Sequence, residues 1–266
     1  MVHTFNLSGK VVIVTGGYGY LGKAITESLL FHGAIVYVLG RSEAKFNDAF
    51  AQTEQANLFF QFCDVSDSKS IITALEFISS QVNKIDVLIN NAFYIQGLSP
   101  VKMTDEEWNM GVEGTLGSVF KFTREIIPYF LKNKAGKIIN VSSMYGMISP
   151  DFSIYDNNPQ FLNPPHYGAA KAGIIQLTKY YANYLGQYGI TVNAVTPGPF
   201  PSEKVQAQAH FINELCIRTS LKRVGVVEDI AGAFIFLASN ASNFVTGQDR
   251  KSTRLNSSHA NISYAV

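Results

Sequence analysis

The sequence has few cysteines, almost no net charge and no long apolar run. It contains 2 cysteines in 266 residues, and neither Cys63 nor Cys216 has a ligand-type residue at metal-binding spacing, so we expect two free thiols and no metal site. Its 21 basic and 20 acidic residues leave a net charge of +1, which gives no sign of a basic surface for a nucleic-acid backbone. No segment reaches the roughly 18 apolar residues of a membrane span, and residues 1–10 lack the apolar core of a signal peptide. These absences predict a soluble, cytoplasmic protein with no nucleic-acid partner and no membrane partner.

What the sequence does contain is an alternation of short apolar segments and longer amphipathic segments. Hydrophobic residues make up 47% of the chain and charged residues 15%, as in a folded globule with a large core. Short segments rich in β-branched residues are typical of buried parallel strands; they span residues 10–15, 34–39, 58–63, 85–90, 137–142 and 190–196. The segments between them have the length and pattern of crossover helices; they span residues 20–32, 43–57, 68–83, 105–132 and 166–188. The alternation predicts an α/β protein with a single-domain, Rossmann-like, doubly wound parallel sheet in the strand order 3-2-1-4-5-6.

Two segments depart from this alternation. Residues 144–166 carry four of the nine prolines and are too long for an ordinary connection, so we expect a functional loop that shapes the mouth of a substrate site. Residues 249–266 combine serines, asparagines and basic residues without a helical or strand period. We therefore predict one domain over residues 1–248 and a tail, residues 249–266, that is foreign to the fold.

A glycine-rich loop follows the first predicted strand. Residues 15–22 are Thr-Gly-Gly-Tyr-Gly-Tyr-Leu-Gly and lead directly into a predicted helix. Glycines at such a turn let the backbone approach a dinucleotide pyrophosphate, which binds the N–H groups of the helix N-terminus. An ordinary strand-to-helix turn is the alternative, and the position after the first strand favours the nucleotide site. The residues expected at the cofactor are Gly16, Gly17, Tyr18, Tyr20, Leu21 and Gly22.

The end of the second predicted strand indicates which nucleotide binds. A carboxylate usually stands there to bind the ribose 2′-hydroxyl of NAD, and an arginine accommodates the 2′-phosphate of NADP. Here the strand is followed by Arg41, and no acid occupies its tip. A guanidinium can bind a phosphate through two donors, so the sequence favours NADP, with NAD possible and a plain solvated arginine as the alternative. After the third and fourth strands, we expect Asp64 and Val65 near the adenine and Asn91 and Ala92 near the nicotinamide half.

Six sequence motifs occur in the order in which the short-chain dehydrogenase/reductase family carries them. They are the glycine-rich loop at 15–22, Asp64-Val65, Asn-Asn-Ala at 90–92, Ser142-Ser143, Tyr-Gly-Ala-Ala-Lys at 167–171, and Pro197-Gly198. The chain therefore resembles this family over about residues 6–248. The resemblance implies NAD(P)-dependent interconversion of an alcohol and a carbonyl, and it places Pro197 and Gly198 at the cofactor. It also implies a homo-oligomer, a dimer or a tetramer.

Tyr167 and Lys171 can supply the proton chemistry that a carbonyl reduction needs. Hydride addition leaves an alkoxide, which must receive a proton from a positioned acid. A phenol titrates near 10, and one ammonium about 4 Å away lowers that value by roughly 3 units at an effective dielectric of ~20. Lys171 lies one helical turn after Tyr167, so we expect it to lower the pKa of Tyr167, although such a pair can also be an ordinary helix surface pair. The resemblance further implies that Ser143 binds the substrate oxygen and that Lys171 holds the nicotinamide ribose.

Four positions depart from the family pattern. Tyr20 stands in place of a glycine of the loop, and Phe93 stands where a glycine usually follows Asn-Asn-Ala. Thr115 takes the position that often carries a proton-relay asparagine, so we expect its hydroxyl, or a water, to serve in the relay. After Gln248 the family continues into a last strand, whereas this chain has a tail that resembles a read-through artefact. We therefore expect the seventh strand to be lost or replaced and one sheet edge to be uncovered.

These features predict an oxidoreductase acting on a small polar or sugar-like alcohol or carbonyl compound. The inserted segment 149–155 is similar to that of relatives that modify bacterial surface sugars and flagellin. A cofactor-binding regulatory or scaffold protein without activity is a second hypothesis, suggested by Thr115 and the altered end, and the retention of Ser143, Tyr167 and Lys171 argues against it. A nucleotide-sugar epimerase or dehydratase is a third, but such enzymes normally have a larger C-terminal substrate domain.

Overall fold

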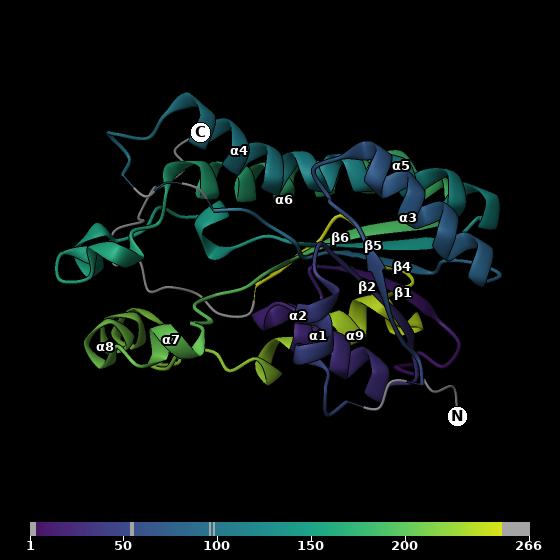
Figure 1. The fold of residues 1–266 in the computed structure, drawn as a ribbon, viewed down its shortest axis with the longest axis horizontal. Helices are drawn as coiled ribbons and strands as arrows, with labels where there is room; N and C mark the ends of the chain where they lie inside the picture. The colour runs from purple at the N-terminus through teal and green to yellow at the C-terminus, as the bar shows by residue number, and fades with distance from the viewer. Residues whose placement is uncertain (1–3, 54–55, 96, 98, 252–266) are drawn as a thin grey trace, which may run out of the picture.

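The computed structural model describes residues 4–53, 56–95, 97 and 99–251, which form one sheet with helices on both faces (Figure 1). The sheet is entirely parallel, in the order β3-β2-β1-β4-β5-β6-β7. Its strands are β1 (Val11–Thr15), β2 (Ile35–Gly40), β3 (Leu58–Phe62), β4 (Val87–Asn90), β5 (Gly136–Val141), β6 (Ile190–Thr196) and β7 (Asp249–Lys251). The predicted α/β class and the predicted order of the first six strands are confirmed.

The central strands are buried along their whole length because helices cover both faces of the sheet. In β1 every residue is buried, and its side chains alternate between two separate cores. Val12 and Val14 pack on the side of the helices that carry Ile25 and Phe234, while Ile13 packs on the side that carries Phe122. A continuous apolar run is therefore the pattern that this sheet requires.

The helices form two layers. One face carries α3 (Ser68–Gln81), α4 (Asp105–Val112), α5 (Ser118–Asn133) and α6 (Pro165–Leu185), and the other carries α1 (Tyr20–Phe31), α2 (Glu43–Ala49) and α9 (Glu228–Ala238) (Figure 1). Ser42 caps α2, Asp67 caps α3, and Thr104 with Glu107 forms a capping box at α4. The N-cap of α1 is Gly19, which has no side chain to bond the first N–H groups. None of the helices in the described ranges is long and apolar enough to cross a bilayer.

Some predicted helices differ from those observed. The helix predicted over 105–132 is divided by a π-helical turn, η1 (Glu113–Gly117), between α4 and α5. The helix predicted over 43–57 ends early, at Ala49, because the chain turns where Phe50 is buried against Phe46. Three helices were not predicted: α7 (Glu203–Gln206), α8 (Ala209–Arg218) and α9.

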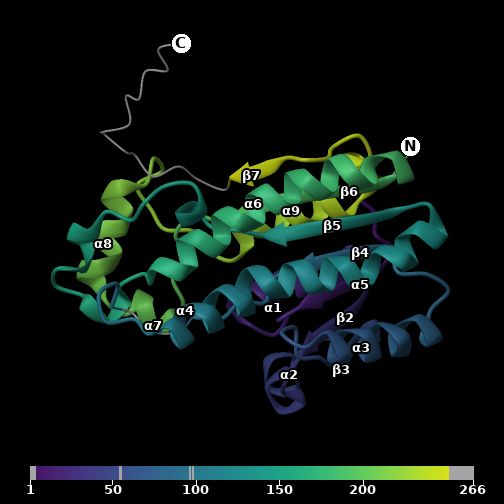
Figure 2. The ribbon, with the colours of Figure 1, turned by 90° about the horizontal axis from the view of Figure 1, so that it is seen from above.

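The seventh strand is replaced rather than lost. Asp249–Lys251 form β7, which pairs with β6 so that Ala194 lies opposite Asp249, and the Thr196 hydroxyl bonds the Asp249 carboxylate. The residues that replace the family sequence thus build a strand of 3 residues beside the 7 residues of β6. Figure 2 shows β7 at one edge of the sheet and β3 at the other. Residues 252–266, the rest of the predicted tail, lie outside the described residues.

The carboxyl ends of the strands point to one edge of the sheet, and the segment 144–166 lies beyond that edge together with α7 and α8 (Figure 2). The segment contains three short 3-10 turns, η2 (Met144–Gly146), η3 (Phe152–Tyr155) and η4 (Pro159–Phe161). Ile154 and Tyr155 form a small separate core with Phe211 and Leu215 of α8. Ligands of doubly wound folds bind at this edge of the sheet.

Candidate functional site

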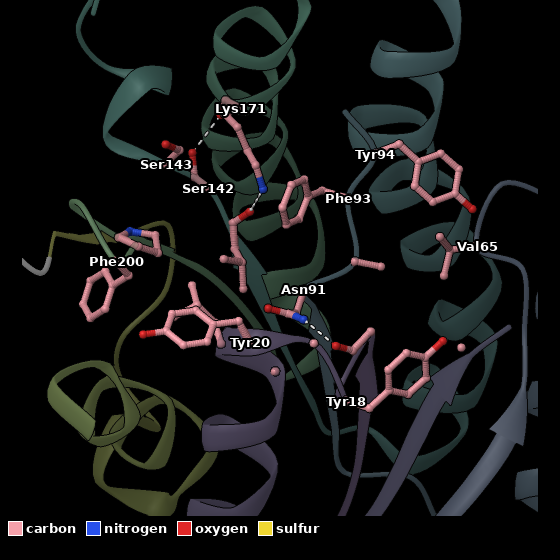
Figure 3. Close-up of a pocket in the computed structure, with 18 of the residues that line it drawn as sticks. Tyr18, Tyr20, Val65, Asn91, Phe93, Tyr94, Ser142, Ser143, Lys171 and Phe200 are labelled. Carbon is pink, nitrogen blue, oxygen red and sulfur yellow. Dashed lines mark hydrogen bonds between the residues drawn. The ribbon is translucent and has the colours of Figure 1, made fainter. Parts of the chain in front are cut away.

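A cavity of about 540 Å³ opens at the carboxyl edge of the sheet, within the usual size range of small-molecule sites. Its wall runs from the glycine-rich loop, past the ends of β2, β4 and β5, to the first turns of α6 (Figure 3). Most of the residues predicted for the site line it: Gly16, Tyr18, Tyr20, Leu21, Gly22, Arg41, Val65, Asn91, Ala92, Ser143, Tyr167, Lys171, Pro197 and Gly198. The fold therefore brings the predicted cofactor-binding residues and the predicted residues Ser143, Tyr167 and Lys171 into one cavity.

The conformation and packing of the glycine-rich loop disfavour side chains at Gly16 and Gly22. Gly16 has φ +63°, and a Cβ at Gly22 would lie 2.3 Å from the Gly16 carbonyl oxygen. The Asn91 side chain donates to the carbonyl oxygens of Thr15 (3.0 Å) and Gly16 (3.1 Å), which fixes the loop to the end of β4. The predicted residue Gly17 faces the core against Thr26 rather than the cavity.

Arg41 belongs to a charged and aromatic cluster at one end of the cavity. Its guanidinium lies 4.0 Å from the Asp64 carboxylate and 4.9 Å from the centre of the Tyr94 ring. The Tyr94 hydroxyl donates to Asp64 at 3.1 Å. Partial burial works to raise the pKa of Asp64, but hydrogen bonds from Ser66 and Tyr94, together with Arg41, outweigh it and hold the pKa below its ordinary value. Asp64 is thus held as an anion by the protein's own groups, and unlike Val65 it does not line the cavity.

The tip of β2 is shaped by Tyr18. The backbone N–H of Arg41 donates to the Tyr18 hydroxyl at 3.1 Å. A Cβ at Gly40 would lie 2.4 Å from the Tyr18 ring. The ring therefore takes the space that an acidic side chain at residue 40 would need.

Ser143, Tyr167 and Lys171 come together where β5 ends against the start of α6. Pro165 begins α6, a position that suits its fixed φ, so Tyr167 falls in the first turn and Lys171 one turn later. The Lys171 ammonium donates to the Val141 carbonyl at 2.7 Å, and the Ser142 hydroxyl donates to the Lys171 carbonyl at 2.8 Å. Figure 3 shows both contacts. These bonds tie α6 to the end of β5.

The pKa values at this end of the cavity differ from the sequence-based expectation. Burial raises the pKa of Tyr167 above its ordinary value of 10.0, with the Ser143 hydroxyl working in the opposite direction. Burial also lowers the pKa of Lys171 to about 7. The expected lowering of the Tyr167 pKa by Lys171 is therefore wrong, because desolvation of both groups is the larger effect. Tyr167 holds its proton at neutral pH.

Comparison with known proteins gives the family. A family model described as enoyl-(acyl carrier protein) reductase matches residues 20–251. The chain is 33% identical over 245 residues to the 3-oxoacyl-[acyl-carrier-protein] reductase FabG of Thermotoga maritima, covering 91% of this chain and 95% of the relative. It is also 33% identical over 246 residues to FabG of Escherichia coli, with the same coverage. The chain belongs to the short-chain dehydrogenase/reductase family. It is an NAD(P)-dependent oxidoreductase that acts on CH–OH and carbonyl groups.

Two solved structures are similar over nearly the whole chain. A putative gluconate dehydrogenase from Agrobacterium tumefaciens has a TM-score of 0.84 at 27% identity, covering 93% of this chain and 96% of that one. A short-chain dehydrogenase from Leptospira borgpetersenii with bound NAD⁺ has a TM-score of 0.84 at 29% identity, covering 95% and 94%.

The cavity of this short-chain dehydrogenase/reductase fits a nicotinamide dinucleotide. The tight backbone at Gly16 and Gly22, next to the N-terminus of α1 with no side-chain cap, is the cradle that a pyrophosphate needs. Tyr20, which replaces the family glycine, is directed towards Phe200 (Figure 3), and its hydroxyl accepts from Gln206 of α7 at 3.2 Å. The substitution therefore adds a contact to α7.

Thr115 does not line the cavity of this enzyme. Its hydroxyl donates to the Tyr94 carbonyl (3.1 Å) and accepts from the Tyr94 N–H (3.3 Å). The hydroxyl proton and one of its lone pairs are thus taken by one backbone segment, and the lysine ammonium bonds Val141 instead. In the structure, Thr115 holds the Phe93-Tyr94 segment in place and is not hydrogen-bonded towards Lys171.

Sequence reasoning missed several residues of the cavity wall. They are Gly19, Leu39, Gly40, Cys63, Phe93, Tyr94, Val141, Ser142, Phe200 and Ser202. Cys63 is a free thiol, and burial raises its pKa to about 12, which makes it unreactive at neutral pH. The signal that could have identified Phe93 is its departure from the family glycine, which the sequence showed without indicating what the ring contacts.

Proposed function

We propose that the protein interconverts an alcohol and a carbonyl with Ser143, Tyr167 and Lys171 as catalytic residues, and that reduction is the favoured direction. The observation that carries the proposal is the meeting of these three side chains on the wall of the cavity that begins at the glycine-rich loop. The similarity to proteins named 3-oxoacyl-[acyl-carrier-protein] reductase supports the reductive direction.

Each catalytic residue has one task in this proposal. A bound nicotinamide cofactor supplies the hydride to the carbonyl carbon. The Ser143 hydroxyl binds the carbonyl oxygen, and Tyr167 donates its proton to the alkoxide that forms there. The charged Lys171 ammonium stabilises the phenolate left on Tyr167. A tyrosine whose pKa burial raises is protonated at neutral pH, and it is therefore suited to donate.

The proposed cofactor is NADP, with NAD as the alternative. Arg41 offers a guanidinium at the end of the cavity that faces the tip of β2, and Tyr18 fills the place where a ribose-binding acid would stand. The neighbour from Leptospira borgpetersenii was solved with NAD⁺. Titration of this chain with NADPH and with NADH measures the preference.

The proposed substrate is a small polar or sugar-like molecule. The hydroxyls of Tyr145 and Tyr155 lie 3.2 Å apart beside the site. Tyr167 is close enough to Tyr145 to raise the pKa of Tyr145. One structural neighbour is titled a putative gluconate dehydrogenase. Hydroxyl groups beside the site suit a substrate that carries several hydroxyls.

We also propose a homo-oligomer, a dimer or a tetramer. Large aromatic side chains are exposed on neighbouring helices of one face, with Phe120 on α5 and Tyr180 and Tyr184 on α6. Clusters of exposed apolar residues of this kind mark contact surfaces between subunits.

The direct test of the proposal is Tyr167→Phe. The variant lacks the proton donor but keeps the ring, so we expect NADPH binding within about twofold of the wild type and a loss of turnover of 10²-fold or more. Fluorescence titration with NADPH and NADH measures binding, and a panel of carbonyl and polyol substrates measures turnover. Unchanged turnover in Tyr167→Phe would contradict the assignment. NADPH binding by the wild type without any turnover across the panel would instead support the regulatory or scaffold alternative.

A further inference from the structure

Phe93 lies directly against the two residues proposed to move the proton. The centre of its ring is 5.2 Å from Lys171 Nζ and 5.8 Å from the centre of the Tyr167 ring, with the two ring planes at 67°. The Phe93 side chain lines the cavity and is 47% exposed. Figure 3 shows it beside the Lys171 ammonium. The family usually has a glycine here, so this contact comes from the chain's own sequence.

Lys171 is held without a carboxylate partner among the described residues. It is 2% exposed, and its ammonium bonds the Val141 carbonyl of β5. Tyr167, on the same helix, is the titratable group that faces it, with its ring centre 5.6 Å away. The β4–α4 connection contributes Phe93, which is uncharged. Tyr145 of η2 faces Tyr167, and Ser142 bonds the lysine backbone.

A buried ammonium needs compensation for the water that it has lost. One carbonyl oxygen supplies part of it, and the negative faces of two aromatic rings within 6 Å supply another part. The Tyr167 ring is common to the family motif, whereas the Phe93 ring is an addition.

We propose that Phe93 is a positioning residue, whose ring keeps the Lys171 ammonium charged and in place beside Tyr167 through a cation–π contact. The catalytic consequence rests on the proposed function, because reduction needs a charged Lys171 when Tyr167 gives up its proton. The contact itself can be tested without turnover.

The direction of the effect follows from the charge. Burial already lowers the pKa of Lys171 to about 7, so the lysine loses its charge near neutral pH. An aliphatic side chain of similar size would keep water out but would not attract the cation. Without that attraction, the pKa of Lys171 would fall further, by roughly 0.5–1 unit. The charged form, and reduction with it, would be lost at a correspondingly lower pH.

The experiment compares Phe93→Leu with Phe93→Tyr in the full chain. Phe93→Tyr is the matched control because it keeps an aromatic face. Lysine-selective ¹³C labelling and NMR give the titration of Lys171, whose signal is assigned by its disappearance in Lys171→Met. We expect the Lys171 pKa to fall by roughly 0.5–1 unit in Phe93→Leu and to stay within about 0.2 unit in Phe93→Tyr. An unchanged or raised pKa in Phe93→Leu would overturn the proposal, and Phe93→Met serves as the aliphatic variant if the leucine variant does not fold.

The pH profile of NADPH-dependent reduction provides the second readout. The descending limb of the pH profile of kcat should move to lower pH in Phe93→Leu, by as much as the Lys171 pKa falls by NMR. It should not move in Phe93→Tyr. A lower Lys171 pKa by NMR without a shift of the descending limb of the kcat profile would overturn the positioning role. If the wild type reduces no carbonyl, the proposed function fails, while the NMR comparison still decides whether Phe93 supports the ammonium.

Discussion

The residues at the tip of β2 are the basis of the proposed preference for NADP. Tyr18 stacks over Gly40, where a Cβ would lie 2.4 Å from its ring, and its hydroxyl fixes the backbone of Arg41. An acid that could bind a ribose 2′-hydroxyl has no room at residue 40. The Arg41 guanidinium is held beside Asp64 and Tyr94, and it can bind a 2′-phosphate with two parallel donors.

Arg41→Ala should therefore weaken NADPH binding selectively. A hydrogen bond to a charged group contributes roughly 1.5–3 kcal/mol, and because the Arg41 side chain is 59% exposed, we expect the lower end, about a tenfold rise in Kd for NADPH. The Kd for NADH should change less than about twofold. Fluorescence titration of both cofactors checks this, with Arg41→Lys as the control that keeps the charge but not the planar fork. Tighter binding of NADH than of NADPH by the wild type would contradict the argument.

The residues predicted from sequence were those whose chemistry follows from their type and place. A tyrosine and a lysine one turn apart, or an arginine after a strand, can be assigned before any contact is known, and the cavity contains all three. Phe93 and Tyr94 could not be assigned in this way. Phe93 contacts residues more than 70 positions away in the sequence, and the partners of Tyr94 are Asp64, Arg41 and Thr115, which come from three other segments.

Among the secondary-structure elements, the π-helical turn η1 explains what Thr115 does. A π-helical turn inserts an extra residue into a helix and often lies at a functional site. Here the turn presents Thr115 to the backbone of Tyr94 and Gly114 to its ring, since a Cβ at Gly114 would lie 2.1 Å from that ring. The turn therefore sets the position of Tyr94, and through it that of Asp64 and Arg41.

Thr115→Val should lower stability more than it lowers turnover. The variant leaves the partly buried N–H and C=O of Tyr94 without their hydroxyl partner, so we expect the free energy of unfolding to fall by about 1–3 kcal/mol. Binding of NADPH should weaken because Tyr94 supports Arg41, while kcat at saturating cofactor should stay within about threefold. Urea unfolding and steady-state kinetics measure these effects, and Thr115→Ser is the control that keeps the hydroxyl. A collapse of kcat at unchanged stability would favour the proton-relay role instead.

Periodicity predicted the main elements of this fold but not the irregular ones. The long segments of α3 and α6 carry enough repeats for the pattern to be clear, and their starts agree with prediction within a residue. The π-helical turn joins α4 to α5 without an interruption, so the segment 105–132 was predicted as one helix. β7 is too short, at 3 residues, to show alternation, and it is a strand because β6 offers it a ladder of hydrogen-bonding groups.

At the scale of the whole molecule, the two faces of the sheet differ in what they expose. Tyr180 and Tyr184 stack at 6.3 Å on the outer side of α6, and on α5 Arg124 lies over the Phe120 ring at 5.4 Å. Arg124 also acts on the pKa of Tyr181 of α6, so α5 and α6 lie close together. On the opposite layer, Phe31 at the end of α1 is 88% exposed.

A contact surface between subunits on α5 and α6 predicts that charge placed there will separate them. Tyr184→Glu puts a carboxylate into a surface that would be desolvated in the oligomer, and an unpaired buried charge is strongly unfavourable. We expect the wild type to have the mass of a dimer or tetramer at micromolar concentration, and Tyr184→Glu or Phe120→Glu to shift it towards the monomer by at least tenfold in dissociation constant, equivalent to about 1.4 kcal/mol. Size-exclusion chromatography with light scattering measures the masses. Phe31→Glu is the matched control, because it adds the same charge at an exposed aromatic residue of the other layer and should leave the mass unchanged. A monomeric wild type, or equal dissociation in all three variants, would show that this surface is not the interface.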